Sequence, residues 1–338
     1  MKKNFLSKTL KSGAETLKLG FGAWLYVAKL TIPALILTRL LLYFELIPYV
    51  AIAFKPLMSL VGLPPEAALI WVSSMLANLF VGVAVYLSLI PVMEPLTVVQ
   101  ITVLGSMIGI AHNLIAEGQI CKGVGLSFGR VSVFRIVAAI IFGLGIHLFS
   151  LASGWGAEPA VMLKALEGIS EPVPSWAGWA LSCLKQLLFI LLVIETMMLL
   201  MAAIKFFKLT KLIMIVLRPP LKLMGIGESA SMVTIIGLVL GLSYSGGIII
   251  AETRAGRILP KDIFGAMMLI AIFHSVIEDS LVIWTMGASL WWLLGARLIY
   301  CFALIALVMR LAEKPRWRPI LVGEKLSGGF SGPAGQEI

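Results

Sequence analysis

Apolar residues gather in long runs along this chain, and short polar or basic stretches separate the runs. A helix needs about 20 apolar residues to cross the hydrocarbon core of a bilayer, which is ~30 Å thick. The pattern therefore predicts an all-α polytopic membrane protein. The predicted apolar spans cover residues 24–44, 67–90, 96–121, 131–151, 187–206, 232–250, 263–287 and 291–309.

The apolar pattern also occurs twice. The segment His112-Asn113-Leu114-Ile115-Ala116-Glu117-Gly118 matches His274-Ser275-Val276-Ile277-Glu278-Asp279-Ser280 at an offset of 274 − 112 = 162. Arg135 meets Arg297 at this offset, and the unit Pro-x-x-x-Leu-x-Gly occurs at 56–62 and again at 219–225. Two of the three histidines thus stand at equivalent points of a duplicated unit, which predicts two structural repeats.

Composition supports the membrane class and argues against a soluble domain, a nucleic-acid-binding protein and an enzyme. Hydrophobic residues make up 60% of the chain, charged residues make up 13%, and the mean hydropathy is +1.02, whereas a soluble domain is about half apolar and a quarter charged. The net charge of +10 lies on Lys and Arg beside the spans, as the positive-inside rule expects, so we expect no nucleic-acid partner. The three scattered cysteines, and the lack of an H-E-x-x-H or dinucleotide-loop motif, predict neither an enzyme nor a cofactor.

Five regions follow from these patterns. A lysine-rich amphipathic stretch without a cleavage site predicts an interfacial helix at the N-terminus. An acidic, proline-containing linker divides the repeats, and a tail rich in Gly, Pro and charge is expected to be disordered. The predicted boundaries are 1–22 for the interfacial helix, 23–153 for the first repeat, 154–182 for an extracytoplasmic linker, 183–312 for the second repeat and 313–338 for the cytoplasmic tail.

The course of the two histidine segments decides the topology. If each segment crosses the membrane fully, every half has four crossings and the halves are parallel, so that Arg130 and Arg135 lie outside while the acidic linker lies inside. If each segment forms a re-entrant hairpin, every half has three crossings and the halves are inverted, which places nearly all basic clusters and both termini in the cytoplasm. Arg254, Arg257 and Lys261 are then the exception. We therefore predict two inverted repeats in the inner (cytoplasmic) membrane, each with three transmembrane helices, an interfacial helix and a re-entrant hairpin that carries a histidine at its tip.

The Pro-x-x-x-Leu-x-Gly unit, followed by the His-x-x-x-x-acid segment, resembles the nucleoside-recognition, or Gate-domain, membrane proteins. That family is related to the gate region of bacterial ferrous-iron permeases, to spore-maturation membrane proteins and, distantly, to concentrative nucleoside transporters. The resemblance covers about 23–311 and implies the fold. The Gln-Thr-Glu signature of concentrative nucleoside transporters and the G-x-x-x-x-G-K-[ST] loop of a GTPase domain are both absent, so neither nucleoside nor iron carries over by residue.

Ionisable residues inside apolar spans are the candidates for a binding site. Such a group costs about 2.5–3.5 kcal/mol at mid-bilayer on insertion scales and usually faces a cavity or a partner, and His and carboxylate can bind divalent metals or relay protons. The structural alternative is that each histidine only ties its own hairpin together and that Arg135 and Arg297 anchor helices at the interface. The predicted substrate-binding residues are His112, Asn113, Glu117, His274, Ser275, Glu278, Asp279, Asn78, Ser243 and Ser245.

These patterns predict a secondary permease that carries a small polar solute or ion and works in contact with the lipid bilayer, alone or as a homo-oligomer. A non-transporting membrane scaffold of the spore-maturation type and a divalent-metal permease are the alternatives. A scaffold is expected to tolerate His274→Ala and Glu278→Gln. A permease is expected to lose turnover in these variants while it remains folded and inserted.

Overall fold

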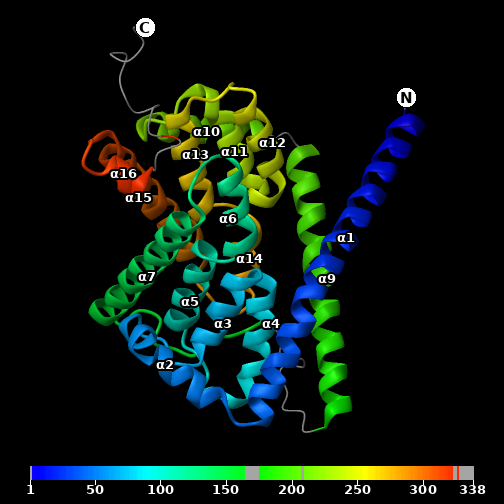
Figure 1. The fold of residues 1–338 in the computed structure, drawn as a ribbon. Coiled ribbons are helices and arrows are strands. Elements are labelled where there is room, and N and C mark those ends of the chain that lie inside the picture. The colour runs from blue at the N-terminus through cyan, green and yellow to red at the C-terminus, as the bar shows by residue number, and fades with distance from the viewer. Residues whose placement is uncertain (1, 164–174, 207–208, 323–325, 327–338) are drawn as a thin grey trace, which may run out of the picture.

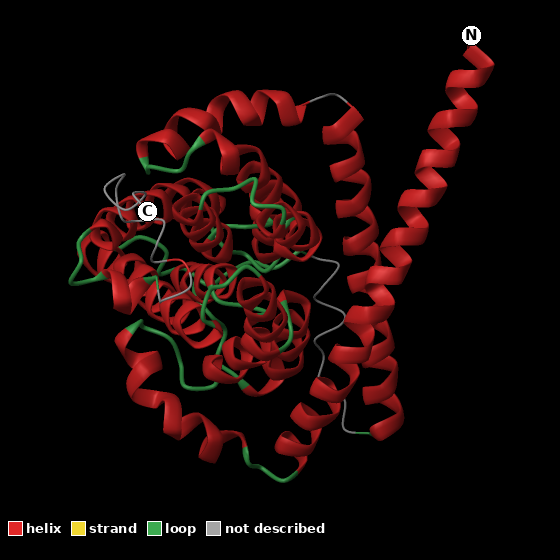
Figure 2. Cartoon of the chain, turned by 45° about the horizontal axis from the view of Figure 1, so that its top comes forward, coloured by secondary structure: helices red, strands yellow, loops and turns green. Residues whose placement is uncertain are grey.

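The computed structural model describes residues 2–163, 175–206, 209–322 and 326, and every regular element among them is a helix (Figure 1, Figure 2). The prediction of an all-α polytopic membrane protein is confirmed. Six segments are long and apolar enough to cross a membrane, by length and composition. They are 17–43, 98–123, 128–153, 176–200, 260–284 and 291–313.

The two halves of the chain contain the same order of elements. The first half holds α1 (Lys2–Tyr43), α2 (Ile47–Leu60), α3 (Ala67–Leu76), α4 (Leu79–Leu89), η1 (Ile90–Val92), α5 (Val98–Ile110), α6 (Leu114–Gly123) and α7 (Phe128–Ser153). The second half holds α9 (Trp176–Phe206), α10 (Leu209–Leu223), α11 (Glu228–Leu240), α12 (Leu242–Arg254), α13 (Pro260–Ile272), α14 (Val276–Trp284), η2 (Trp291–Ala296), α15 (Arg297–Glu313) and the short α16 (Arg318–Leu321).

The predicted boundary at residue 22 does not appear in the structure. The backbone of α1 runs without a break through residue 22, so the predicted interfacial helix and the first span are one helix. Side chains 1–16, residues 164–174 of the predicted linker and most of the tail lie outside the described residues.

The segment 67–90, predicted as a full span, folds back on itself as α3 and α4. The break lies at Ala77 and Asn78, and the Asn78 side chain caps α4 by accepting a hydrogen bond from the Val81 N–H at 3.0 Å. Past the break, Gly82 packs against Ser74 and the backbone of Ile70, which places α4 antiparallel to α3. These two short helices form a hairpin, so this segment does not cross the molecule.

The second half contains the equivalent hairpin in α11 and α12, in place of the predicted span 232–250. The helix is interrupted at Gly241, whose φ of +86° is a conformation that a glycine adopts without steric cost. The Gly227 N–H donates to Asp262 at 2.9 Å, and Gly237 packs against Ile270. Helix α11 therefore runs parallel to α13, so α12 between them must return.

The first histidine segment runs on through its break, contrary to the predicted hairpin. Helix α7 contacts the whole segment in antiparallel order, with Phe128 against Gly118, Arg135 at the break and Gly143 against Met107. Figure 1 shows α5 and α6 in succession along α7. The segment is a broken helix that continues in one direction.

The second histidine segment follows the same course along η2 and α15. Ser280 Oγ donates to the Leu293 carbonyl at 3.4 Å, Cys301 Sγ lies 3.7 Å from the Ile272 carbonyl oxygen, and Gly265 packs against Met309. The prediction of a hairpin at each histidine segment is therefore wrong, and the hairpins lie in the segments that precede the histidines. Apolar length could not distinguish the two courses, because two helices of about ten residues, each ~15 Å long, contain as many apolar residues as one span.

Equivalent helices of the two halves run antiparallel where they meet. Trp24 Nε1 of α1 donates to the Leu187 carbonyl of α9 at 2.8 Å, and Tyr43 packs on Trp176 with ring centroids 5.9 Å apart. Helices α1 and α9 lie together along one side of the other helices (Figure 1). They form a wall beside the two histidine breaks.

Basic loops gather at one end of the molecule. Lys261, in the first turn of α13, pairs with Glu313 at the end of α15 at 2.5 Å, and Lys122 and Arg130 line a depression together with Pro319. The start of α1 and the helix α16 are drawn at this end (Figure 1). At the opposite end the linker joins the loops before α5 and η2, with Val98 N–H donating to Glu158 and Leu163 N–H to Thr285, each at 2.9 Å.

Candidate functional site

The two histidine breaks lie against each other in the interior. Each break ends one helix, α5 or α13, and starts the next, α6 or α14, through a residue in the left-handed region: Asn113 with φ +51° and Ser275 with φ +45°. A left-handed residue other than glycine costs of order 1–3 kcal/mol, and such strain is concentrated at functional sites. The repeat thus places the same strained geometry at two points that face one another.

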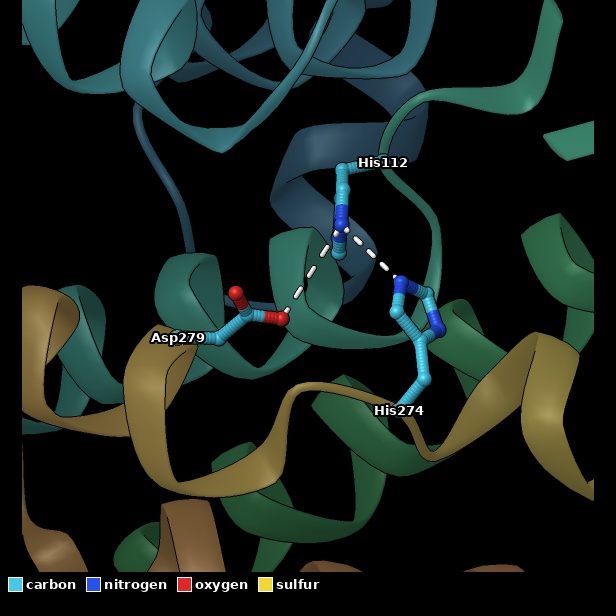
Figure 3. A group of neighbouring side chains, drawn as sticks. All are labelled: His112, His274 and Asp279. Carbon is cyan, nitrogen blue, oxygen red and sulfur yellow. Dashed lines mark hydrogen bonds and ion pairs between the residues drawn. The ribbon is translucent and has the colours of Figure 1, made fainter. Parts of the chain in front are cut away.

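Backbone hydrogen bonds orient both imidazole rings in the same way. His112 Nδ1 lies 2.9 Å from the Ile108 carbonyl oxygen, and His274 Nδ1 lies 2.9 Å from the Ile270 carbonyl oxygen. Because a carbonyl oxygen only accepts, each Nδ1 must carry the hydrogen. The two Nε2 atoms are left facing each other at 3.3 Å (Figure 3).

Carboxylates from α6 and α14 complete the cluster. Glu117 Oε1 lies 2.9 Å from His274 Nε2 and 3.8 Å from His112 Nε2. Asp279 Oδ2 lies 3.9 Å from His112 Nε2, and Figure 3 shows this carboxylate pointing toward that ring. All four side chains are buried, and the structure brings them together in the interior.

Arg135 closes the first break. Its Nη1 donates to Glu117 Oε2 at 2.6 Å, while its Nε and Nη2 donate to the carbonyls of Ile110 at 3.0 Å and His112 at 2.8 Å. These carbonyls stand at the end of α5, where a helix leaves its last carbonyls without partners. Arg135 is fully buried, so its interpretation as an interface anchor is wrong.

Arg297, the equivalent of Arg135, is equally buried but makes none of these bonds. Nε, Nη1 and Nη2 all lack a hydrogen-bond partner among the described residues. The guanidinium lies over the Phe273 ring, 5.2 Å from its centroid, and Nη1 lies directly against Gly109 of α5. The interface-anchor interpretation fails here too, because the side chain reaches into the interior.

A cavity of about 330 Å³ opens beside the cluster. Its polar wall comes from both breaks and both hairpins, and its apolar wall comes chiefly from α1 and α9. Eight of the ten predicted residues line it: Asn78, His112, Asn113, Glu117, His274, Ser275, Glu278 and Asp279.

The other two predicted residues are Ser245, which is not part of this lining, and Ser243. The Ser245 hydroxyl donates to the Gly241 carbonyl of its own hairpin at 2.9 Å, and the side chain of Ser243 lies outside the described residues. Sequence reasoning also missed the apolar wall, which includes Tyr26 of α1 and Met198 of α9. No signal distinguishes these from lipid-facing residues, because both types are apolar.

Comparison with known proteins places the chain among membrane proteins. It is similar to the uncharacterized membrane protein YvoD of Bacillus subtilis, with 28% identity over 335 residues that cover 96% of this chain and 99% of that protein. No protein-family model matches the chain, and no solved structure matches it. The similarity and the six candidate spans together identify a membrane protein in contact with the lipid bilayer, while the resemblance to nucleoside-recognition proteins stays a prediction.

Proposed function

We propose that this protein is a secondary permease for a small polar solute or ion. The observation that carries the proposal is the meeting of two broken helices and two hairpins around one buried polar cavity. Buried ionisable groups are expensive in a membrane and are retained where a pathway or a ligand needs them. Irregular backbone at such depth is tolerated only where it is enclosed by protein or lines a wet cavity.

The arrangement of the halves supports an alternating-access mechanism. Besides α1 and α9, α7 and α15 run antiparallel, with Tyr300 Oη donating to the Ala138 carbonyl at 2.8 Å and Phe149 stacked edge-on against Trp292 at 5.2 Å. We infer that the halves are inverted repeats. Rocking of one repeat against the other would open the cavity to each side in turn.

The corrected hairpins strengthen the charge argument for this topology. Each half keeps three crossings, because one predicted span becomes a hairpin and one predicted hairpin becomes a span. Arg254, Arg257 and Lys261 then lie at the same end as Lys122 and Arg130. The one exception to the positive-inside rule disappears, and this end, with both termini, is the cytoplasmic one in our proposal.

Cysteine accessibility tests the inversion at equivalent positions. Glu94 and Ala255 are exposed and precede the two broken helices. Single variants Glu94→Cys and Ala255→Cys should react with a membrane-impermeant maleimide from opposite sides of oriented vesicles, the first from outside and the second from the cytoplasm. Labelling of both from one side would mean parallel repeats and would remove the structural basis for alternating access.

Uptake into proteoliposomes tests the transport activity directly. The panel should hold nucleosides, small organic ions and divalent metals, with His274→Ala as the inactive variant and His147→Ala as the matched control, since His147 of α7 contacts Gly62, away from the cavity. We expect one class of solute to accumulate in the wild type and the control only. Equal leakage in all three preparations would favour the scaffold function.

A further inference from the structure

We propose that His112, His274 and Asp279 form a binding site for one divalent transition-metal ion, and that such an ion is the solute of the permease. The binding claim rests on the geometry of the cluster alone. The transport claim rests in addition on the function proposed above. The two claims can therefore fail separately.

The fixed tautomers of the histidines are the first argument. Since both Nδ1 atoms donate to backbone carbonyls, both neutral rings present a bare Nε2 lone pair, and these lone pairs face each other across 3.3 Å. With neutral rings three acceptors meet here, because Glu117 Oε1 also lies 2.9 Å from His274 Nε2. Either a proton on His274 Nε2 or a metal cation relieves their repulsion. A cation between them gives each lone pair a partner, and neutral imidazole is a common metal ligand.

The spacing of the ligand atoms is the second argument. Zinc binds histidine nitrogen at about 2.0–2.1 Å in tetrahedral sites, which separates two such nitrogens by about 3.3–3.4 Å. The observed Nε2 to Nε2 distance is 3.3 Å. One atom from each of His112, His274 and Asp279 lies within 4.8 Å of the others, so small side-chain rotations bring all three to one ion.

The hydrogen bonds from the two rings to backbone carbonyls are the third argument, because they fix the orientation of the rings. A metal-bound histidine almost always donates its other ring N–H to a carbonyl or carboxylate, which fixes the ring orientation. Ile108 and Ile270 fill this role one turn before each histidine. Glu117, which lies 2.9 Å from His274 Nε2 and is held by Arg135, is the candidate fourth group.

The charge of the surroundings selects a cation over an anion. The cluster and its neighbours hold three carboxylates, Glu117, Glu278 and Asp279, and two guanidiniums, Arg135 and Arg297, so that with neutral histidines the sum is 2 − 3 = −1. A divalent cation brings the sum to +1, whereas a monoanion brings it to −2. Charge separation matters more in a dry interior than in water.

The ligand types narrow the class of ion. Ca²⁺ and Mg²⁺ prefer sites made of oxygen ligands, and Mg²⁺ keeps several waters. Two imidazoles with one carboxylate suit Zn²⁺, Fe²⁺, Co²⁺ or Ni²⁺ instead. The site is thus expected to discriminate against Mg²⁺ and Ca²⁺.

Co²⁺ is the probe for the first test, because the visible absorption of a four- or five-coordinate Co²⁺ site differs from that of the hydrated ion. We expect the purified, metal-stripped full chain in detergent to bind one Co²⁺ with such a spectrum, and one Zn²⁺ to displace it, while excess Mg²⁺ does not. Asp279→Asn, His112→Gln and His274→Ala should each weaken binding at least about tenfold. The absence of one-to-one binding would overturn the site.

Two controls separate ligation from general attraction. His147→Ala removes the one histidine outside the cluster and should leave binding unchanged. Glu278→Gln removes a charge from the cavity wall next to Asp279 without removing one of the three ligands. If Glu278→Gln weakens binding as much as Asp279→Asn, the carboxylates only attract the ion and the ligand assignment is wrong. A variant that loses its monodisperse elution is set aside in favour of the two others.

Zn²⁺ uptake into proteoliposomes with an internal fluorescent chelator separates the two claims. Binding with uptake that Asp279→Asn abolishes supports both. Binding without Zn²⁺ uptake keeps the metal site and overturns the claim that the ion is the transported solute. Uptake of another solute without Co²⁺ binding keeps the permease and overturns the metal site.

Discussion

The two histidine breaks are built from equivalent residues, yet an arginine side chain makes hydrogen bonds to the groups of only one of them. In the first break Arg135 bonds Glu117 and two helix-end carbonyls, whereas in the second Arg297 bonds no described residue and Asp279 Oδ2 also lacks a hydrogen-bond partner. Duplicated sequence therefore does not imply duplicated bonding. The bonded and unbonded versions of one motif thus lie against each other beside the cavity.

A small residue explains where Arg297 goes. Its Nη1 lies against Gly109 of α5, while the equivalent position in the second half is Ala271. The missing Cβ of Gly109 leaves room for the guanidinium to reach across the repeat boundary. The asymmetry between the breaks therefore involves a sequence difference, Gly109 against Ala271, as well as a difference in the conformation of the arginine side chains.

The largest effect is expected from Arg135→Met. This change leaves the Glu117 carboxylate and two carbonyls buried without a partner, which costs about 3–5 kcal/mol for a broken buried ion pair. The measurement is a thermal unfolding midpoint in detergent, which should fall sharply.

Arg297→Met is the matched variant for that measurement. It removes an arginine that makes no hydrogen bond to a described residue, so stability should change little or rise, because replacement of a buried charge by an apolar side chain of similar size removes a desolvation cost. Equal losses in the two variants would show that the breaks are bonded alike and would refute the asymmetry.

Substitution of the Glu117 and Asp279 carboxylates should also lower stability by unequal amounts, with a smaller difference than between the two arginine variants. Glu117→Gln weakens a charge-assisted bond of 2.6 Å to Arg135, worth about 1.5–3 kcal/mol. Asp279→Asn, whose Oδ2 has no hydrogen-bond partner among the described residues, should cost less. The same unfolding assay compares them, and the reverse order would contradict the bonding described for the two breaks.

Gly109→Ala should displace the Arg297 guanidinium, because the new Cβ collides with Nη1. Crowding of a packed interior costs about 1–3 kcal/mol. The double variant Gly109→Ala with Arg297→Met removes the collision, so it should recover most of the lost stability. No recovery in this double-mutant cycle would place the clash elsewhere.

The smallest effect is expected from Ser245→Ala. The hydroxyl bonds the Gly241 carbonyl within its own hairpin, and its loss should cost about 1 kcal/mol or less. Uptake of the transported solute should be unchanged in proteoliposomes. A selective loss of uptake would restore Ser245 to the binding site, where the sequence pattern placed it.

The sequence by itself determined the class of the protein, its duplication and most of the polar wall. Apolar runs with few charges leave only a membrane location, and the 162-residue offset pairs His112 with His274 and Glu117 with Asp279 before any contact is known. These inferences rest on composition and on spacing along the chain. They needed no knowledge of how the segments pack.

Only the tertiary structure decided which segments cross and what the arginines bind. Two half-length helices and one full span have the same apolar content, so the course of 98–123 depends on packing against α7, whereas that of 67–90 depends on the packing of α4 against α3. Arg135 and Arg297 stand at equivalent positions, but their partners lie on other elements. The type and spacing of a residue determine which groups it can bond to. Which of these groups lies close enough to bond is determined only when the chain folds.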